Sequence, residues 1–205
     1  LPAEYSHLHL CIGGELAAVI CISDPLRSEA RAAVQALHDC GIRRVVMMTG
    51  DNRRTAEAVA AEVGVDQVFA EVLPEDKAEF IRKAKADGHT VIMVGDGVND
   101  SPALSEANAG IAISTGAAIA REIADITVAS EDLFELVTLR RLSEALMDRI
   151  HRNYRFIVGF NMSLIILGVI GILPPTTSAL LHNMSTLAIS LKSMTDLLPG
   201  EEKDA

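Results

Sequence analysis

The stretch Met93-Val94-Gly95-Asp96-Gly97-Val98-Asn99-Asp100-Ser101-Pro102-Ala103-Leu104 decides the fold that we predict for this chain. It continues an apolar run from Val91 to Val94, which is typical of a strand buried on both faces of a parallel sheet. Glycines allow a sharp bend where the strand ends, and Pro102 suits the first turn of a following helix. Asp96 and Asp100 are therefore expected at the carboxyl end of a strand, where open α/β sheets bind ligands.

The residue types in this turn favour a divalent-metal site. Two carboxylates that lie close together, Asp96 and Asp100, repel each other unless a cation lies between them. Carboxylate, amide and water oxygens are ligands that suit Mg²⁺, and Asn99 can orient the loop or its waters. The alternative is a solvated loop, because Gly, Asp and Asn are common in turns. A second motif is needed to decide between them.

Strand and helix patterns alternate around this turn. Two apolar runs, 8–12 and 16–22, flank Gly13-Gly14 and predict a β-hairpin. The further predicted strands are 45–48, 67–70, 91–94, 109–113 and 126–128, and the predicted helices include 53–63, 74–86 and 103–107. Strands that alternate with helices at this spacing predict parallel βαβ units, so the fold class that we expect is α/β with a doubly wound parallel sheet.

The second motif is Thr49-Gly50-Asp51, which ends the predicted strand 45–48. In a doubly wound sheet this turn and the Asp96 turn face one cleft. The Thr49 hydroxyl and the Gly50 N–H can contact a phosphoryl oxygen, and Lys77 can neutralise its charge. Lys77 taken alone is typical of a surface lysine at a helix start, but its position relative to both turns favours a phosphoryl-transfer site.

Charge and cysteine usage exclude some classes of protein. The formal net charge is −10 and no basic stripe occurs, so nucleic acid is not an expected partner. Cys11, Cys21 and Cys40 form no C-x-x-C pair and are odd in number, which indicates reduced core residues of an intracellular domain. The first residues carry neither an initiator Met nor a signal-peptide pattern, and we expect a piece of a longer protein.

The last part of the chain predicts a membrane hairpin. Two apolar runs, about 156–173 and 179–198, flank a Pro-Pro loop that carries no charge. The first run is close to the ~20 residues that a membrane helix needs. A basic cluster precedes it, so both ends of the hairpin are expected on the cytoplasmic side. The alternative, a buried helical hairpin in a soluble domain, fits the length and the charge asymmetry less well.

Polar residues interrupt these two runs, and inside a membrane they are costly. The residues concerned are Asn161, His182, Asn183, Ser185 and Thr186. We expect them to contact a transported ion, and imidazole suits Zn, Co, Ni and Cu alike. The alternative for these residues is hydrogen bonding between helices, which Ser and Thr in particular often provide.

The motifs together resemble the P-type cation-transporting ATPases, whose phosphorylation domain is haloacid-dehalogenase-like. Four of them match in order along the chain, namely Asp24-Pro25-Leu26-Arg27, Thr49-Gly50-Asp51, Pro74-Glu75-Asp76-Lys77 and Gly95 to Leu104. Two spans after the phosphorylation domain are similar to the heavy-metal-transporting branch. His182-Asn183-Met184-Ser185-Thr186 looks like the metal motif of that branch, although Asn183 stands where a carboxylate is expected.

The resemblance implies roles for individual residues. Asp96 would coordinate Mg²⁺ with support from Asn99 and Asp100, whereas Thr49 and Lys77 would contact the phosphoryl group. Asp24 and Arg27 would lie near the nucleotide, and ATP and Mg²⁺ would be the cofactors. The implied protein is an integral membrane pump with a cytoplasmic catalytic domain and a transition-metal cation as its cargo.

The expected domains are 1–22 as a hairpin leading into the phosphorylation domain, 23–148 as an incomplete phosphorylation domain and 149–205 as two transmembrane helices with a short tail. No Asp-Lys-Thr-Gly segment occurs, so the aspartate that family members phosphorylate is expected in a missing amino-terminal part. A free phosphatase fits poorly without this nucleophile. A non-catalytic, split or degenerate pump half that binds partners is the remaining alternative.

Overall fold

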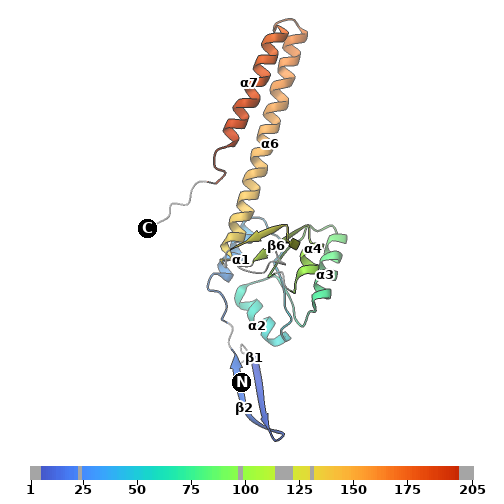
Figure 1. Cartoon of the computed structure of the whole chain (residues 1–205), viewed down its shortest axis with the longest axis vertical. Helices are drawn as coiled ribbons and strands as arrows, with labels where there is room; N and C mark the ends of the chain where they lie inside the picture. Colours follow the sequence, from blue (N-terminus) through green and yellow to red (C-terminus); the bar gives the residue numbers. More distant parts are fainter. Residues whose placement is uncertain (1–5, 23–24, 97–98, 114–121, 130–131, 199–205) are drawn as a thin grey trace, which may run out of the picture. The chain divides into compact units, whose positions relative to one another are not determined.

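The structure, a computed structural model, describes residues 6–22, 25–96, 99–113, 122–129 and 132–198. It divides into two compact units, Leu1–Val137 and Thr138–Ala205 (Figure 1). The long helix α6, Phe134–Val169, runs without a break through position 148, where the sequence predicted a domain boundary.

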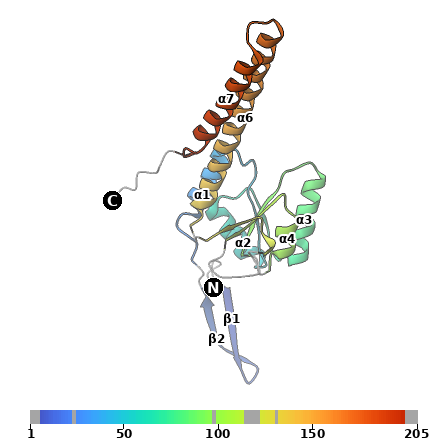
Figure 2. The same cartoon turned by 45° about the horizontal axis from the view of Figure 1, so that its top comes forward.

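The first unit begins with the predicted β-hairpin, and the structure confirms it (Figure 2). Strands β1, Ser6–Ile12, and β2, Glu15–Ile22, pair antiparallel around Gly13 and Gly14, whose φ angles are 64° and 88°. Both angles lie in the left-handed region that glycine tolerates best. In the described part of the chain β1 and β2 pair only with each other. Cys11 and Cys21 are exposed here, so the prediction that they are core residues is wrong, and Cys40 is only half-buried.

The remainder of the first unit alternates helices and strands as predicted. Its elements are α1 Ala30–Asp39, β3 Val46–Met48, α2 Arg53–Val63, β4 Gln67–Phe69, α3 Pro74–Ala86, β5 Ile92–Gly95, α4 Ser101–Glu106, β6 Ala109–Ile113 and β7 Ile126–Val128. Local signals fix several ends: Asn52 accepts a hydrogen bond from the Thr55 N–H and caps α2, which stops at Gly64 with φ 81°. Pro74 starts α3.

All strand pairs after the hairpin are parallel, which confirms the α/β class. Among the described residues they form two sheets, β3–β4 and β5–β6–β7, rather than the one continuous sheet that the sequence predicts. In these sheets β3 pairs only with β4, and β5 pairs only with β6. The carboxyl ends of β3 and β5 carry the two predicted site turns.

Strand β5 corrects one prediction, because it is not buried on both faces. Met93 is 7% exposed, whereas Ile92 and Val94 on the opposite face are 44% and 37% exposed. Successive side chains of a strand point to opposite faces, and only the Met93 face packs into the core. This core contains Ile81 of α3 together with Ala103 and Leu104 of α4.

Helix α4 packs closely on strand β6 at Gly110. A Cβ atom built there would lie 2.7 Å from the Leu104 carbonyl oxygen, so only glycine allows this approach. The close contact holds α4 against the sheet, and Asp100 lies directly before this helix.

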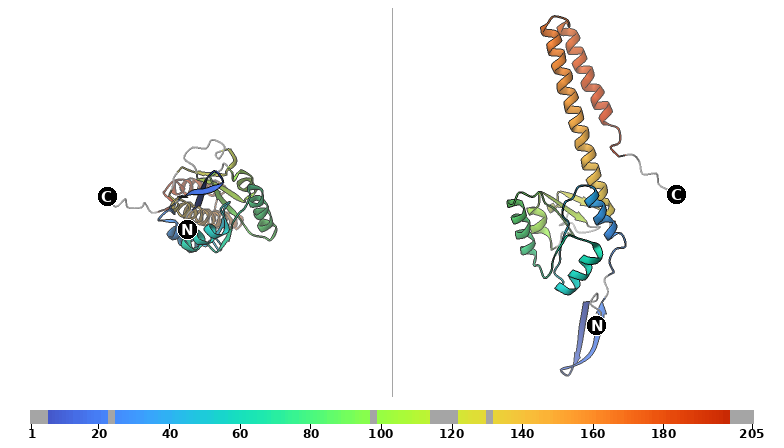
Figure 3. Two further views of the ribbon diagram at one scale, coloured as in Figure 1. Left: turned by 90° about the horizontal axis from the view of Figure 1, so that it is seen from below. Right: turned by 180° about the vertical axis from the view of Figure 1, so that it is seen from behind.

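The second unit consists of the rest of α6 and helix α7, Pro175–Ser193, which run side by side (Figure 3). Their turn includes Gly171 at φ 79°. At the other end of α7 the Arg149 guanidinium donates hydrogen bonds to the carbonyl oxygens of Ser193, Thr195 and Asp196, at 3.1, 2.5 and 2.6 Å. Asn153 adds a hydrogen bond to the Ser193 hydroxyl at 2.9 Å.

The predicted membrane spans 156–173 and 179–198 are not recovered, since none of the helices in the described ranges is both long and apolar enough to cross a membrane. Two features of the helices account for this. The apolar run starts at Phe156 but α6 ends at Val169, so its helical part is shorter than the ~20 residues that a membrane helix needs. In α7 the polar residues His182, Asn183, Ser185 and Thr186 interrupt the apolar sequence of the helix.

Candidate active site

Three motifs of the first unit supply the candidate site. Thr49-Gly50-Asp51 directly follows β3, Asp96 directly follows β5, and Lys77 lies in the first turns of α3. The carboxyl ends of parallel strands are the usual ligand-binding edge of an α/β sheet. Gly97 and Val98, in the middle of the quoted turn, lie outside the described residues.

The strongest contact in the site joins Lys77 to Asp100. The Lys77 Nζ donates to Asp100 Oδ1 at 2.7 Å, and the two side chains are only 14% and 13% exposed. A paired lysine that is largely buried is not an ordinary surface lysine, because burial of an ionised group is costly without a partner. The structure thus brings together two predicted site residues from α3 and from the residue before α4.

Gly95 makes room for this ion pair. A Cβ atom at position 95 would lie 2.6 Å from Asp100 Oδ2 and 2.9 Å from Asp100 Cβ. Any side chain there would displace Asp100 from its place beside the end of β5. The glycine that the sequence placed in the turn for bending is therefore also required for the position of the carboxylate.

The Thr49 turn is closed by its own side chains. The Thr49 hydroxyl donates to Asp51 Oδ2 at 3.0 Å, and the Asp51 N–H donates back to Thr49 Oγ1 at 3.1 Å. Thr49 is half-buried, whereas Gly50 and Asp51 are exposed. The turn therefore presents the Gly50 backbone and the Asp51 carboxylate to solvent.

A backbone connection that the sequence did not reveal links this turn to α3. The Glu71 N–H donates to the Asp51 carbonyl at 2.9 Å, and the Val72 N–H donates to the Thr49 carbonyl at 3.0 Å. At the next residue, the Leu73 N–H donates to Asp76 Oδ2 at 3.2 Å in the first turn of α3. Glu71 has φ 59°, which is unusual for a residue other than glycine, and no sequence signal predicted it.

The donor set fits Mg²⁺ in type. Asp96 and Asn99 are exposed beside the more buried Asp100. In the ranges that the structure describes, no three His, Cys, Asp or Glu side chains gather in a way that could hold a metal ion. Mg²⁺ does not need such a cage, since it commonly binds one or two carboxylates and completes its shell with water and substrate phosphates. The exposed carboxylate of Asp96, directly after β5, is a donor of the type that such a site requires.

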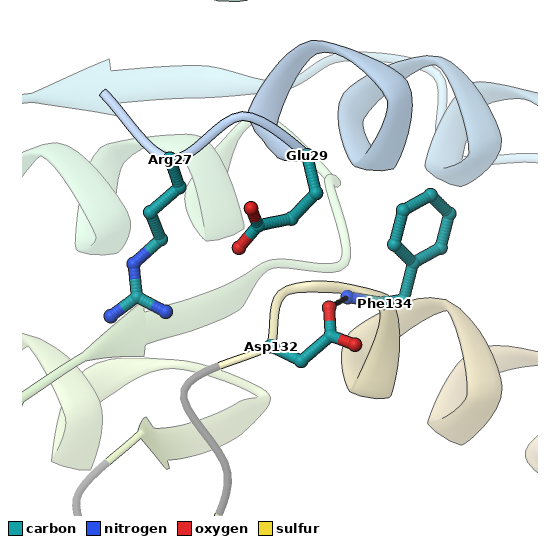
Figure 4. A pocket seen from close by; sticks show the side chains of 4 residues that line it. All are labelled: Arg27, Glu29, Asp132 and Phe134. Carbon is teal, nitrogen blue, oxygen red and sulfur yellow. Dashed lines mark hydrogen bonds between the residues drawn. The ribbon is translucent and has the colours of Figure 1, made fainter. Parts of the chain in front are cut away.

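The predicted nucleotide residues are only partly described. Asp24 lies outside the described residues. Arg27 is exposed and lines an open pocket with Glu29, Asp132 and Phe134 (Figure 4). In this pocket the Phe134 N–H donates to Asp132 Oδ1 at 2.8 Å. None of these other lining residues was a predicted site residue.

Two of the predicted ion-site residues in the second unit contact each other across the two helices. His182 Nδ1 lies 2.8 Å from Asn161 Oδ1. An amide oxygen only accepts, so this hydrogen bond requires a proton on Nδ1. The hydroxyls of Ser185 and Thr186 instead donate to the His182 carbonyl within α7, at 2.8 and 3.1 Å, and not across the helices as the alternative interpretation of these residues had it. Asn183 is exposed.

Comparison with known proteins gives consistent matches. Residues 3–108 match the haloacid dehalogenase-like hydrolases. The chain is 46% identical over 176 residues to "Copper-transporting ATPase 2" of Rhizobium meliloti (strain 1021), which covers 86% of this chain and 21% of that protein. It is 41% identical over 187 residues to "Zinc-exporting P-type ATPase" of Mycobacterium marinum, which covers 91% of this chain and 26% of that protein.

A solved structure agrees with these relatives. The crystal structure of a zinc-transporting PIB-type ATPase in the E2.Pi state matches with a TM-score of 0.82 and 29% sequence identity, over 94% of this chain and 31% of that one. The predicted resemblance to heavy-metal P-type ATPases is confirmed. The chain spans only about a fifth to a quarter of the length of the two curated relatives.

Proposed function

Because the chain belongs to the haloacid dehalogenase-like hydrolase family, we propose that it is the carboxyl-terminal part of an ATP-driven heavy-metal cation pump. The observation that carries this proposal is the Lys77–Asp100 ion pair, 2.7 Å long and largely buried beside the end of β5. It belongs to a chain that resembles named metal pumps over most of its length. A regulatory pump half without catalysis has no such observation in its favour.

The proposed reaction passes through an aspartyl-phosphate intermediate. Its nucleophile is a carboxylate supplied by another part of the longer protein, since this chain has no Asp-Lys-Thr-Gly segment. The Thr49 hydroxyl and the Gly50 N–H contact the phosphoryl oxygens, and Asp51 orients Thr49. Lys77 neutralises charge that develops on the transferring group, and Asp100 holds Lys77 in place.

Asp96 is the proposed first carboxylate ligand of Mg²⁺, with Asn99 and Asp100 orienting its water ligands. When bound, the ion neutralises charge on the phosphate groups of ATP. Arg27 and Asp24 are proposed to lie near the nucleotide, whose own binding domain would belong to the missing amino-terminal part. Asp51 is the acidic residue of the Thr49 turn, and it is exposed.

The exposed face of β5 supports the view that further chain completes this unit. Ile92 and Val94 are 44% and 37% exposed on a strand that lies at the edge of the described sheet. The unpaired backbone edge of such a strand is a liability that proteins usually cover or pair, and exposed apolar side chains on a sheet face are usually covered by packing. We propose that a strand of the longer protein pairs with β5 and brings the nucleophile beside Asp96.

The α6–α7 hairpin is the proposed membrane part, packed among other helices of the longer pump. Large apolar side chains such as Ile165, Val169 and Leu187 are 60%, 82% and 61% exposed. Polar groups at membrane depth are tolerated where they face other helices or an ion pathway. His182 and Asn161, with Asn183, Ser185 and Thr186 nearby, would then line the path of a transition-metal cation, and the catalytic unit would be cytoplasmic.

The test is ATP hydrolysis by the longer protein with Zn²⁺, Co²⁺, Ni²⁺, Cu⁺ and Mn²⁺ added one at a time. We expect one or more of these metals to stimulate turnover, and Asp96→Ala to abolish phosphorylation from ATP because charge neutralisation is lost. Glu57→Ala removes an exposed carboxylate of α2 and should leave the rate unchanged. Turnover that no metal stimulates would favour the regulatory alternative, whereas normal phosphorylation of Asp96→Ala would remove Asp96 from the proposed Mg²⁺ site.

A further inference from the structure

Glu71 adopts a backbone conformation that glutamate rarely adopts. Its φ is 59°, the only positive φ among the residues other than glycine that the structure describes. For an L-residue this region brings Cβ close to a carbonyl oxygen, and only Gly, and to a lesser degree Asn and Asp, adopt it readily. A conformation with this cost persists only when the surrounding structure imposes it.

The surrounding hydrogen bonds identify what imposes it. Strand β4 ends at Phe69, whose carbonyl still accepts the Thr49 N–H at 2.9 Å in continuation of the parallel ladder. The chain then turns at Glu71, so that the N–H groups of Glu71 and Val72 both reach back to the Thr49 turn, at 2.9 and 3.0 Å. A strand that continued straight would direct these two groups to opposite sides.

The same turn sets the start of α3. Leu73 directly follows Val72, and both of its backbone groups bond within the first turn of α3. Its N–H donates to Asp76 Oδ2 at 3.2 Å, and its carbonyl accepts from the Lys77 N–H at 3.2 Å. Lys77 in turn holds Asp100. Residues 71–73 therefore join the Thr49 turn on one side to Lys77 and Asp100 on the other.

We propose that Glu71 is a positioning residue, whose left-handed backbone keeps the Thr49 turn in register with Lys77 for phosphoryl transfer. This inference rests on the proposed function for its catalytic consequence. Its side chain is exposed, which assigns the role to the backbone and not to the carboxylate. A residue that tolerates the left-handed region should then substitute for Glu71 without loss of this role, whereas a β-branched residue should lose it.

The test compares Glu71→Gly, Glu71→Asn and Glu71→Val. Amide hydrogen exchange at position 71 and at Val72 in the 205-residue chain reports the two backbone bonds directly. Gly and Asn should keep the protection of both amides, whereas Val, whose branched Cβ tolerates the left-handed region least, should lower it about five-fold, the effect of about 1 kcal/mol of strain beyond that of glutamate. Glu62→Val, at an exposed position of α2, is the matched control and should leave both amides protected.

The catalytic consequence is measured as the rate of phosphorylation from ATP in the longer pump. Glu71→Val should lower this rate by a similar factor with the KM for ATP unchanged, and Glu71→Gly should restore it. Equal losses in the Gly and Val variants would mean that the carboxylate acts, and a Val variant without loss would remove the positioning role. A wild-type pump that is never phosphorylated would refute the proposed function, while the exchange data would still decide on the backbone connection.

Discussion

The two units of the molecule hold their polar residues in different ways. In the first unit Lys77 and Asp100 pair with each other and are 14% and 13% exposed, and backbone bonds join the Thr49 turn to residues 71 and 72. In the second unit His182 is exposed and its side chain makes a single contact between helices, with Asn161, while its hydroxyl neighbours bond within α7. The residues of the proposed phosphoryl site are thus held by a largely buried ion pair, whereas those of the proposed ion site share one exposed contact.

This difference in burial predicts how strongly substitutions should act in each unit. A buried, cross-linked pair resists change, since removing one partner leaves an uncompensated charge. An exposed contact between two helices, such as that of His182 with Asn161, leaves most ligands of the proposed metal ion to other groups of the longer protein. We therefore expect the largest effects of substitution in the first unit and graded, smaller effects in the second.

The largest expected effect is that of Asp100→Ala. It leaves the Lys77 ammonium largely buried and unpaired, and should lower the free energy of unfolding of the chain by about 3 kcal/mol. Urea unfolding followed by circular dichroism measures the loss. The control is Glu79→Ala, which breaks the exposed ion pair with Arg82 on the same helix and should cost less than about 1 kcal/mol. Similar losses for both variants would erase the contrast between buried and exposed pairs.

A smaller effect is expected for Asn161→Ala in the longer pump. A hydrogen bond to one ring nitrogen orients the other toward a metal, and loss of such a partner typically weakens metal binding about ten- to a hundred-fold. The metal concentration that half-activates ATP hydrolysis should rise about tenfold. Phosphorylation by inorganic phosphate should be unchanged, because it uses the first unit.

Ser163→Ala serves as the control for this prediction, because the Ser163 hydroxyl bonds to the Gly159 carbonyl within the same helix. It should leave the activation curve in place. If Asn161→Ala behaved like Ser163→Ala, the contact with His182 would serve helix packing, and the ion site would not depend on this pair.

The smallest effects are expected for Ser185→Ala and Thr186→Val. Their hydroxyls bond back to the His182 carbonyl, and such bonds within a helix contribute little. Stability should stay within about 0.5 kcal/mol and metal activation should be unchanged, as measured by urea unfolding of the chain and by ATP hydrolysis of the pump. A tenfold shift in metal activation would make these hydroxyls ligands and bring the second unit closer to the first in its sensitivity.

Much of the first unit could be predicted from its sequence, because local signals there agree with the fold. The glycine pair of the hairpin, Asn52 and Gly64 at the ends of α2, and Pro74 at the start of α3 each act within a few residues. The grouping of Lys77 with Asp100 followed from strand and helix order, since parallel strands bring their carboxyl ends to one edge.

The remaining features depend on contacts that a sequence does not display. The exposure of Ile92 and Val94 follows from what covers β5, and not from the composition of that strand. Glu71 adopts the left-handed conformation although glutamate is not one of the residue types that predict it. The bonding of Ser185 and Thr186 within α7 competes with bonds between helices, and residue type alone does not decide that competition.

The Arg149 contact with the end of α7 gives one residue control over the length of another helix. The last carbonyls of a helix have no partner within it, and a helix can add a turn when the following residues permit. Here the guanidinium donates hydrogen bonds to the carbonyl of Ser193, the last residue of α7, and to those of Thr195 and Asp196 just beyond it. The end of α7 is therefore held at one position along α6. Lysine offers a point charge in place of this planar fork. A lineage that replaced Arg149 by Lys would lose this hold on several carbonyls at once, and the end of α7 would be free to fray before Ser193 or to extend beyond it.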